Sequence, residues 1–562
     1  MAKLAPQEIT VMDQPWFKYA IYGLTALLYF TNFGTNAIWT PNESFYAEAV
    51  REMFESGNYL EFFYNYEPRF NKPPLTYWLI ASSVILFGLN EWAIRLPIVL
   101  LAYLTNFAAA GIAGRLYGPK ASLWTFITMA FSFQFVGNKQ YASPETPLTF
   151  FFTLCMLLFV IAWQSRNKWW LFLAFVTLGF TVLVKGYPYF IVIGAIITLF
   201  VLFYQNWQIK NAWKELRFFI HIPGILISLL IGLSWIIYMN SAYGEAFQEV
   251  LNAETINRAV GKKPFSWEDP FFYPAVISWS FLPYSLAFYL ALILIVRRKK
   301  WREELALPLA WFFAMLLIFT ISSGKIPTYF IQAHPAMAIM VAWVFVNPDI
   351  LPNRKWKIAW NVSLLFPAIL LFASGIALVI YLDLSRNWLE IPLVIALLIG
   401  WLSYRAGKEN TIRLIPFMCV FVPLFIFSLA VLPQLEKYRP YKEIGTIINQ
   451  TVPSASTPIF MQDRILHNLP FYAKRKMIRD ASKEELVNSY NTAGELLALV
   501  KTDTWQAMGS PEPLWNGYIY EKTSESRFAI FVRAHIQAEQ GNMDAFEMYY
   551  LVYSEANKAD LK

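Results

Sequence analysis

Hydrophobic residues recur in long runs over the first three quarters of the chain, separated by short polar loops. A membrane-spanning helix needs about 20 mostly apolar residues, and these runs have that length. The pattern predicts an all-α polytopic membrane bundle of about thirteen transmembrane helices. The expected spans cover roughly residues 17–37, 96–114, 120–137, 145–163, 169–184, 187–205, 218–239, 273–296, 304–322, 328–346, 358–381, 387–404 and 412–432.

One further apolar run, Leu75 to Gly88, has only 14 residues. If it lies at the membrane interface and does not cross, every basic loop falls on the same side as the N-terminus. Because Lys and Arg are enriched in cytoplasmic loops, we adopt that arrangement and place these loops in the cytoplasm. The basic loops carry Arg115/Lys120, Arg166/Lys168, Lys210/Lys214/Arg217, the block "RRKKWR" at 297–302, Arg354/Lys355/Lys357 and Arg405/Lys408/Arg413.

The loops on the opposite side mix acids, lysines, aromatic residues and prolines, so we expect the chemistry on that face. They cover residues 38–95, 138–146, 185–188, 240–272 and 322–329. After Pro433 the pattern changes to polar helical stretches and short strand-like runs, which predict a separate soluble α/β domain on the same extracytoplasmic side. The expected division is therefore a membrane domain over 1–433, with a first extracytoplasmic loop at 38–95, and a soluble domain over 434–562.

The composition supports a membrane protein, since 57% of the residues are hydrophobic and only 15% are charged, against about 25% charged in soluble domains. The net charge of +8 is explained by basic cytoplasmic loops, and we do not expect nucleic acid as a partner. Cys155 and Cys419 both lie in apolar runs, so neither a disulfide framework nor a cysteine metal site is implied. No removable signal peptide is expected.

The stretch "PNESFYAEAVREMFESG" directly follows the first span and predicts a helix with Asn42 as N-cap and Gly57 as stop. Its polar stripe predicts a solvated face that includes an Arg51–Glu55 pair; the stripe consists of Glu48, Arg51, Glu52 and Glu55. Glu43 instead lies on the apolar face. It either stabilises the helix dipole or has a functional role.

Five motifs in sequence order resemble a known family. They are "PNESFYAEAVREMFESGNYL" with "FNKPPLTYWLIASSVILFGLNEWAIRLP", then "YASPETPLTFF", "LVKGYP", "AETINRAVGKKPF" and "SSGKIPTYFIQAHPAMA". Together they span about residues 16–350 and resemble the polyprenyl-phosphate-sugar-dependent glycosyltransferases. Within these the chain is similar to the lipid A aminoarabinose transferases, which are distant cousins of the protein O-mannosyltransferases.

The resemblance implies a GT-C fold with an extracytoplasmic site, a sugar donor on a polyprenyl phosphate, and transfer with inversion. Many relatives open the first motif with Asp-Glu, whereas this chain has Asn42-Glu43, and an Asn cannot act as a base. That role therefore moves to Glu43 or to Glu145, or it lapses. Asn71 stands where relatives have an acid, and the 261–267 segment lacks their histidine. Both departures remove metal-ligand positions of relatives, so no metal site is assigned and no cofactor is firmly implied, while a divalent metal stays an open alternative.

Glycosyl transfer also needs groups that stabilise the departing lipid phosphate. The candidates for binding the donor phosphate are Lys72, Arg258, Lys325 and Tyr329, while Tyr46, Lys185 and Tyr187 are candidates for lining the sugar cavity. Each has an alternative: a lysine at this depth can extend along the interface, and aromatic residues can form an interfacial belt. His221 and His334 are assigned no role.

The sequence thus predicts a multi-pass glycosyltransferase of the bacterial inner membrane that moves a sugar from undecaprenyl phosphate to a lipid A-like or other envelope acceptor. Two alternatives remain open. One is a protein O-glycosyltransferase. The other is a lipid or sugar transporter without catalysis, although a transporter would place ionisable groups near the midplane of interrupted helices. Neither the sugar nor the acceptor can be read from the residues.

Overall fold

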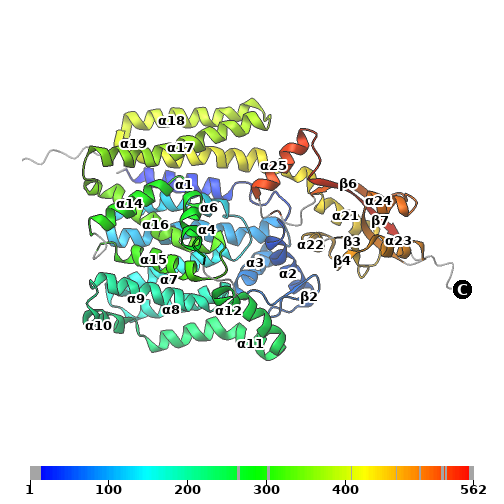
Figure 1. Cartoon of the computed structure of the whole chain (residues 1–562), viewed down its shortest axis with the longest axis horizontal. Coiled ribbons are helices and arrows are strands. Elements are labelled where there is room, and N and C mark those ends of the chain that lie inside the picture. Colours follow the sequence, from blue (N-terminus) through cyan, green and yellow to red (C-terminus); the bar gives the residue numbers. More distant parts are fainter. Residues whose placement is uncertain are drawn as a thin grey trace, which may run out of the picture.

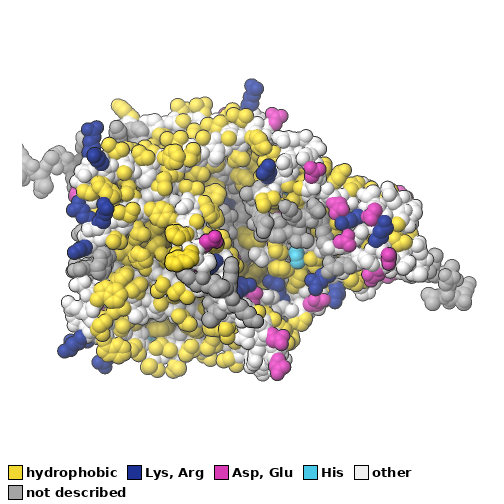
Figure 2. Space-filling model, in the orientation of Figure 1, with side chains coloured by type: hydrophobic (Ala, Val, Ile, Leu, Met, Phe, Trp, Pro, Cys, Tyr) yellow, Lys and Arg dark blue, Asp and Glu magenta, His cyan; other side chains and the backbone are white. Residues whose placement is uncertain are grey.

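The computed structural model describes residues 14–555 except 262–265, 300–303, 407, 464, 493–494, 521–524 and 526–527. It has two parts, a large helical bundle and a smaller domain with a β-sheet at one end of the bundle (Figure 1). We call the bundle end that faces this smaller domain the domain end. The opposite end, where Lys and Arg side chains gather (Figure 2), is called the basic end.

Every predicted span contains at least one helix, although the predicted 17–37 span extends past the first helix, Pro15–Phe30. Among the described residues, seven helices are long and apolar enough to cross a membrane by length and composition, and shorter apolar helices pack beside them. The bundle helices are α1 (Pro15–Phe30), α4 (Glu91–Tyr117), α5 (Pro119–Ala130), α6 (Phe133–Gly137), α7 (Glu145–Ser165), α8 (Lys168–Lys185), α9 (Pro188–Tyr204), α11 (Ile222–Glu254), α13 (Asp269–Ser280), α14 (Ser285–Arg297), α15 (Ala306–Ile321), α16 (His334–Val346), α17 (Arg354–Tyr381), α18 (Glu390–Ala406) and α19 (Lys408–Ile426).

Several predicted spans are interrupted in the described structure, and two of these breaks lie next to each other. The 120–137 run divides into α5 and α6, and the 273–296 run divides into α13 and α14 at a turn that contains Pro283. Proline removes a backbone donor and so favours the second break. The two breaks meet, because the Phe133 backbone N–H donates to the carbonyl of Leu282 at 2.9 Å. Irregular backbone at membrane depth is tolerated where protein surrounds it in this way.

The short apolar run forms α3 (Leu75–Phe87). At 1.5 Å per residue, a helix of 13 residues is about 20 Å long, shorter than the roughly 30 Å hydrocarbon core. Its length is therefore consistent with a helix that does not cross the membrane.

The loops predicted to be basic and cytoplasmic lie together at the basic end. The Gln164 side-chain amide donates to the carbonyl of Arg115 at 3.1 Å, and Trp163 Nε1 donates to Glu215 at 2.7 Å. Glu215 belongs to α10 (Ile209–Phe219), and Tyr117 bonds to the backbone of Glu304. The loops after α4, α7, α9 and α14 therefore share one end of the bundle, as the charge pattern predicts.

The C-terminal part is the predicted α/β domain. Its five-stranded sheet has the order β4-β3-β5-β7-β6. β4 and β5 both run parallel to β3, while β7 is antiparallel to β5 and β6. The elements are α21 (Tyr441–Thr451), β3 (Ile459–Gln462), α22 (Leu469–Ala473), β4 (Met477–Ala481), α23 (Lys483–Asn491), β5 (Leu496–Lys501), α24 (Thr502–Ala507), β6 (Trp515–Tyr520), α25 (Phe528–Glu539) and β7 (Phe546–Ser554).

This domain forms hydrogen bonds and a cation–π contact with the segment that leads from α1 to the next helix. The buried Arg439 guanidinium donates to the carbonyl of Ile38 at 2.9 Å and lies 3.9 Å from the Trp39 ring centroid. Asn468 donates to the same carbonyl at 3.0 Å, and the Tyr472 hydroxyl accepts from the Ile38 N–H at 2.8 Å. These contacts fix the backbone at residues 38–39 immediately before the next helix.

That helix is α2 (Asn42–Ser56), and Gly57 ends it with φ 69°, the left-handed conformation that favours glycine. The N-cap residue is Pro41 rather than Asn42, so the predicted start was one residue late. The Arg51–Glu55 ion pair is present, with Arg51 Nη1 2.7 Å from the Glu55 carboxylate.

The prediction of a solvated polar stripe on α2 was wrong, because Glu48 is 0% and Glu52 is 3% exposed. A hairpin of β1 (Phe63–Tyr64) and β2 (Glu67–Pro68) follows in the same loop, and the Tyr66 N–H in its turn donates to both Glu52 oxygens. Arg51 neutralises Glu48 through two bonds of 2.8 Å. Tertiary cover by the hairpin, which helical periodicity does not report, buries the stripe.

We expect the stability of this loop to fall as pH rises. Burial, together with the nearby Glu48 carboxylate, raises the pKa of Glu52 from 4.5 to about 8. A carboxyl whose pKa is raised on folding stabilises the fold fully below about pH 4.5, and that stabilisation is lost as pH rises through about 8. The Glu52→Gln variant should therefore lose a slope of up to about 1.4 kcal/mol per pH unit.

Thermal unfolding in detergent between pH 5 and pH 9 measures this slope. The matched control is Glu67→Gln in the same hairpin, since the Glu67 side chain is 68% exposed. Parallel pH profiles for wild type and Glu52→Gln would show that Glu52 is ionised in the folded protein throughout this range.

Candidate active site

A cavity of about 1060 Å³ lies at the domain end of the bundle. Its polar side is formed by the 138–145 segment with Asn42, and its apolar side comes from two neighbouring membrane helices, α17 and α19. Residues on the polar side include Asn42, Asn138, Lys139, Gln140, Ser143 and Glu145, and those on the apolar side include Leu371, Ala377, Leu378, Val420 and Leu424.

Glu145 is one of two acids in the described wall of this cavity, and the other, Glu525, forms an ion pair with Arg439. Glu145 is the first residue of α7, directly after Pro144, where an acid is favourable to the helix dipole. Its Oε1 accepts from Lys185 Nζ at 3.1 Å, and the two side chains are 17% and 10% exposed. Lys185 ends α8, and Gly186, with φ 126°, turns the chain into α9. The predicted base and one predicted cavity lysine therefore form an ion pair.

Lys185 connects Glu145 to two further predicted residues. Its ammonium lies 4.7 Å from the centroid of the Tyr329 ring, within cation–π distance. The Tyr329 hydroxyl in turn accepts from Arg258 Nη1 at 2.9 Å. Tyr329 belongs to the 3-10 helix η2 (Pro327–Ala333) and Arg258 to α12 (Ile256–Val260). Four residues from four elements thus meet at the domain end.

The contacts continue to Lys72 through Glu254, a residue that the sequence analysis did not single out. Arg258 Nη2 donates to Glu254 Oε1 at 2.9 Å, and Lys72 forms an ion pair with Oε2 of the same carboxylate. Burial lowers the pKa of Lys72, and the Glu254 carboxylate opposes that shift. The i, i+4 spacing of Glu254 and Arg258 within "AETINR" is a signal that could have found this acid.

We refer to this set as the ionic cluster: Lys72, Glu145, Lys185, Glu254, Arg258 and Tyr329. Its charged side chains are 10% to 39% exposed, so the groups are partly desolvated and still reachable. Three cations and a phenol next to two carboxylates can bind an anionic ligand and can also accept a proton.

The other predicted residues lie beside the ionic cluster. Lys325 pairs with Asp269 at 2.9 Å, although its turn packs on α12 through the Gly324 N–H, which donates to the Arg258 carbonyl at 2.9 Å. The Tyr187 hydroxyl donates to Thr255 at 3.0 Å. Tyr46 is 2% exposed and packs against another ring in the core.

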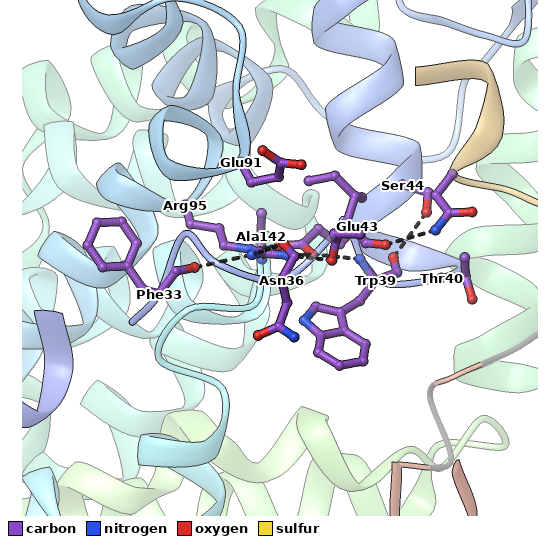
Figure 3. Close-up of polar contacts among 12 residues, drawn as sticks. Phe33, Asn36, Trp39, Thr40, Glu43, Ser44, Glu91, Arg95 and Ala142 are labelled. Carbon is purple, nitrogen blue, oxygen red and sulfur yellow. Dashed lines mark hydrogen bonds and ion pairs between the residues drawn. The ribbon is translucent and has the colours of Figure 1, made fainter. Parts of the chain in front are cut away.

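Glu43, the other candidate base, is completely buried in an ion pair with Arg95 (Figure 3). Arg95 donates to both Glu43 oxygens, at 2.8 Å and 2.6 Å. The Trp39 N–H donates to Oε2 at 2.8 Å and the Ala142 N–H to Oε1 at 3.1 Å. Both oxygens are thus satisfied, and Glu43 is absent from the described lining of the cavity. Arg95, read only as part of "NEWAIRLP", was missed.

No metal ligand set is found in the part of the chain that the structure describes, since no three His, Cys, Asp or Glu side chains there gather closely enough to hold an ion. The Asn71 side-chain amide donates a hydrogen bond to Glu254 at 3.3 Å, whereas an acid at this position could only accept one when ionised. The 261–267 segment lacks the histidine that relatives have there, and its residues 262–265 lie outside the described residues.

Known proteins share this architecture. The crystal structure of ArnT from Cupriavidus metallidurans bound to undecaprenyl phosphate superposes with a TM-score of 0.71 over 91% of this chain and 96% of that one, at 19% identity. The fold is therefore the GT-C fold of membrane glycosyltransferases.

Sequence comparison identifies the family. Residues 17–246 match the model of the dolichyl-phosphate-mannose-protein mannosyltransferases. An uncharacterized protein of Aquifex aeolicus is 36% identical over 81% of this chain and 86% of its own length. An undecaprenyl phosphate-alpha-4-amino-4-deoxy-L-arabinose arabinosyl transferase of Pseudomonas fluorescens is 23% identical over 97% and 98%. The chain belongs to the family of membrane glycosyltransferases that unites these mannosyl and arabinosyl transferases.

We expect the Glu43–Arg95 pair to stabilise the fold. Glu43→Gln leaves the Arg95 charge buried without its counter-ion, and removing one partner of such a pair destabilises a protein by about 3–5 kcal/mol. Thermal unfolding of the purified protein in detergent measures the change. Glu55→Gln is the control, because the Glu55 side chain is 51% exposed and exposed pairs contribute at most about 1 kcal/mol. A Glu43→Gln protein with wild-type stability and no transfer activity would instead make Glu43 the base.

Proposed function

We propose that this glycosyltransferase takes its sugar from a polyprenyl phosphate and transfers it to an acceptor that enters the large cavity. One observation carries the proposal: Glu145 lines the cavity and is also joined, through Lys185 and Tyr329, to Arg258. Glu254 then connects Arg258 to Lys72. A potential base for the acceptor and a potential binding site for the leaving phosphate are therefore adjacent.

The donor is proposed from charge and from relatives. Arg258 can bind a phosphate through two N–H groups, and Lys72 adds a compact positive charge. Several relatives are named undecaprenyl phosphate-alpha-4-amino-4-deoxy-L-arabinose arabinosyl transferases, and the similar crystal structure holds undecaprenyl phosphate. The family membership leaves no reason to retain the transporter alternative.

The proposed reaction is a single displacement with inversion. The acceptor oxygen forms a bond with the anomeric carbon while the bond from that carbon to the phosphate oxygen breaks, and the electron pair stays on the phosphate. Lys72, Arg258 and the Tyr329 hydroxyl stabilise the charge that develops there. Glu145 takes the acceptor proton when the acceptor carries one, and Lys185 orients the Glu145 carboxylate.

In this proposal Glu43 acts indirectly. Its carboxylate binds the Ala142 N–H three residues before Glu145, and Arg95 holds it from α4. Glu43 is therefore a positioning residue that connects the first extracytoplasmic loop to the segment bearing the base.

The cavity favours a lipid acceptor. Its apolar wall belongs to two membrane helices, α17 and α19, which suits an acyl chain better than an extended peptide with unpaired backbone groups. A protein O-glycosyltransferase remains the second candidate, because residues 17–246 match the protein mannosyltransferase model. The basic end would face the cytoplasm of a bacterial inner membrane, with the site on the periplasmic face.

We expect Glu145→Gln to abolish transfer while leaving the binding of undecaprenyl phosphate intact. Loss of a general base lowers the rate about 10²–10⁴-fold, and the cations that hold the phosphate are unchanged. Release of undecaprenyl phosphate from a sugar-loaded donor measures turnover, and Glu67→Gln is the matched control. Full activity in Glu145→Gln would remove this residue from the mechanism.

We expect the acceptor to appear among the envelope lipids. Mass spectrometry of lipids and of glycoproteins, from cells lacking the protein and from cells in which it is restored, should show a sugar-bearing lipid that requires an intact Glu145. A sugar lost only from proteins would support the second candidate instead.

A further inference from the structure

Glu254 holds the donors that we assign to the leaving phosphate. Its Oε1 accepts from Arg258 at 2.9 Å and from the Asn71 amide at 3.3 Å, and its Oε2 pairs with Lys72. The Glu254 side chain is 16% exposed. A single internal carboxylate therefore occupies the hydrogen bonds of two cations and an amide that an incoming phosphate would need.

Carboxylate and phosphate oxygens are acceptors of the same kind, and Lys and Arg bind both. The phosphate of a polyprenyl-phosphate sugar is a diester and carries one negative charge. After transfer it becomes a monoester with a charge of about −1.5 to −2 at neutral pH. The side chains of Lys72, Arg258 and Glu254 together carry a net charge of +1. This charge balances the single negative charge of the diester, but it does not balance the larger negative charge of the monoester.

We propose that Glu254 competes with the product phosphate for Lys72 and Arg258, and so drives release of the polyprenyl phosphate after each transfer. This inference rests on the proposed function. Repulsion between like charges at close range grows with the charge of the ligand and with desolvation. Glu254 therefore weakens binding of the product more than binding of the donor.

The backbone places Glu254 where its side chain can exchange partners. It is the last residue of α11, and Thr255 separates it from α12, which carries Arg258. Ten residues earlier, Gly244 interrupts α11 with φ 51°. Glu254 and Arg258 thus lie on different helical segments, and breaking their ion pair need not disrupt either helix.

Glu254→Gln tests the inference, because the amide keeps the shape of the side chain and removes the competing charge. The full-length protein in detergent is titrated with undecaprenyl phosphate, and product inhibition is measured in the transfer assay. We expect at least tenfold tighter binding of undecaprenyl phosphate, stronger product inhibition, and a smaller change in donor KM. Glu254→Asp, which keeps the charge, should bind the product as wild type does.

Glu61→Gln is the matched control. Glu61 accepts hydrogen bonds from Tyr238 and Tyr243 of α11, the helix that also carries Glu254, at 2.8 Å and 2.9 Å. None of its described contacts is to the ionic cluster. Its substitution removes one negative charge near α11 and should leave product binding unchanged.

The outcomes separate the two proposals. If wild type binds undecaprenyl phosphate and Glu254→Gln binds it equally or more weakly, the inference is overturned, and Glu254 only orients Lys72 and Arg258. If tight binding appears equally in Glu61→Gln, the effect is one of general charge and the inference also fails. If no form of the protein binds undecaprenyl phosphate, the proposed function itself is overturned.

Discussion

The buried ion pair between Glu43 and Arg95 is the interaction on which the site depends. Arg95 also donates to the carbonyls of Phe33, Asn36 and Ala37, so one guanidinium holds the turn between α1 and α2 as well as the helix start. Two charges removed from water are tolerated only when such a network satisfies them. Because Glu43 also bonds to the 138–145 segment, the same pair sets the position of Glu145.

The Glu43–Arg95 pair and the ionic cluster differ in their exposure to solvent. Glu43 and Arg95 are fully buried and neutralise each other, and they therefore contribute rigidity. The ionic cluster is only partly covered, and its side chains come from several separate segments of the chain. Preorganised but accessible charges of this kind stabilise charge that develops during a reaction. The cavity beside them supplies the apolar surface that a membrane-derived substrate requires.

The sequence predicted the bundle, the sheet domain and the common end for the charged loops, because these follow from hydropathy and charge bias. Its motifs also contained all six residues of the ionic cluster, five of which were singled out as candidates. It could not show that Glu48 and Glu52 are buried, since the covering hairpin is a tertiary contact. For the same reason Arg95 was missed, because its partner lies 52 residues away. Glu254 was recognisable only by its spacing to Arg258, a spacing that surface helices share.

The contacts between the sheet domain and residues 38–39 can form only late in biosynthesis. Arg439, Asn468 and Tyr472 reach back across 401, 430 and 434 positions to the backbone of Ile38. The ribosome synthesises residues 38–39 long before it synthesises these three partners. The backbone at residues 38–39 therefore lacks these contacts until the last part of the chain has been made and has folded.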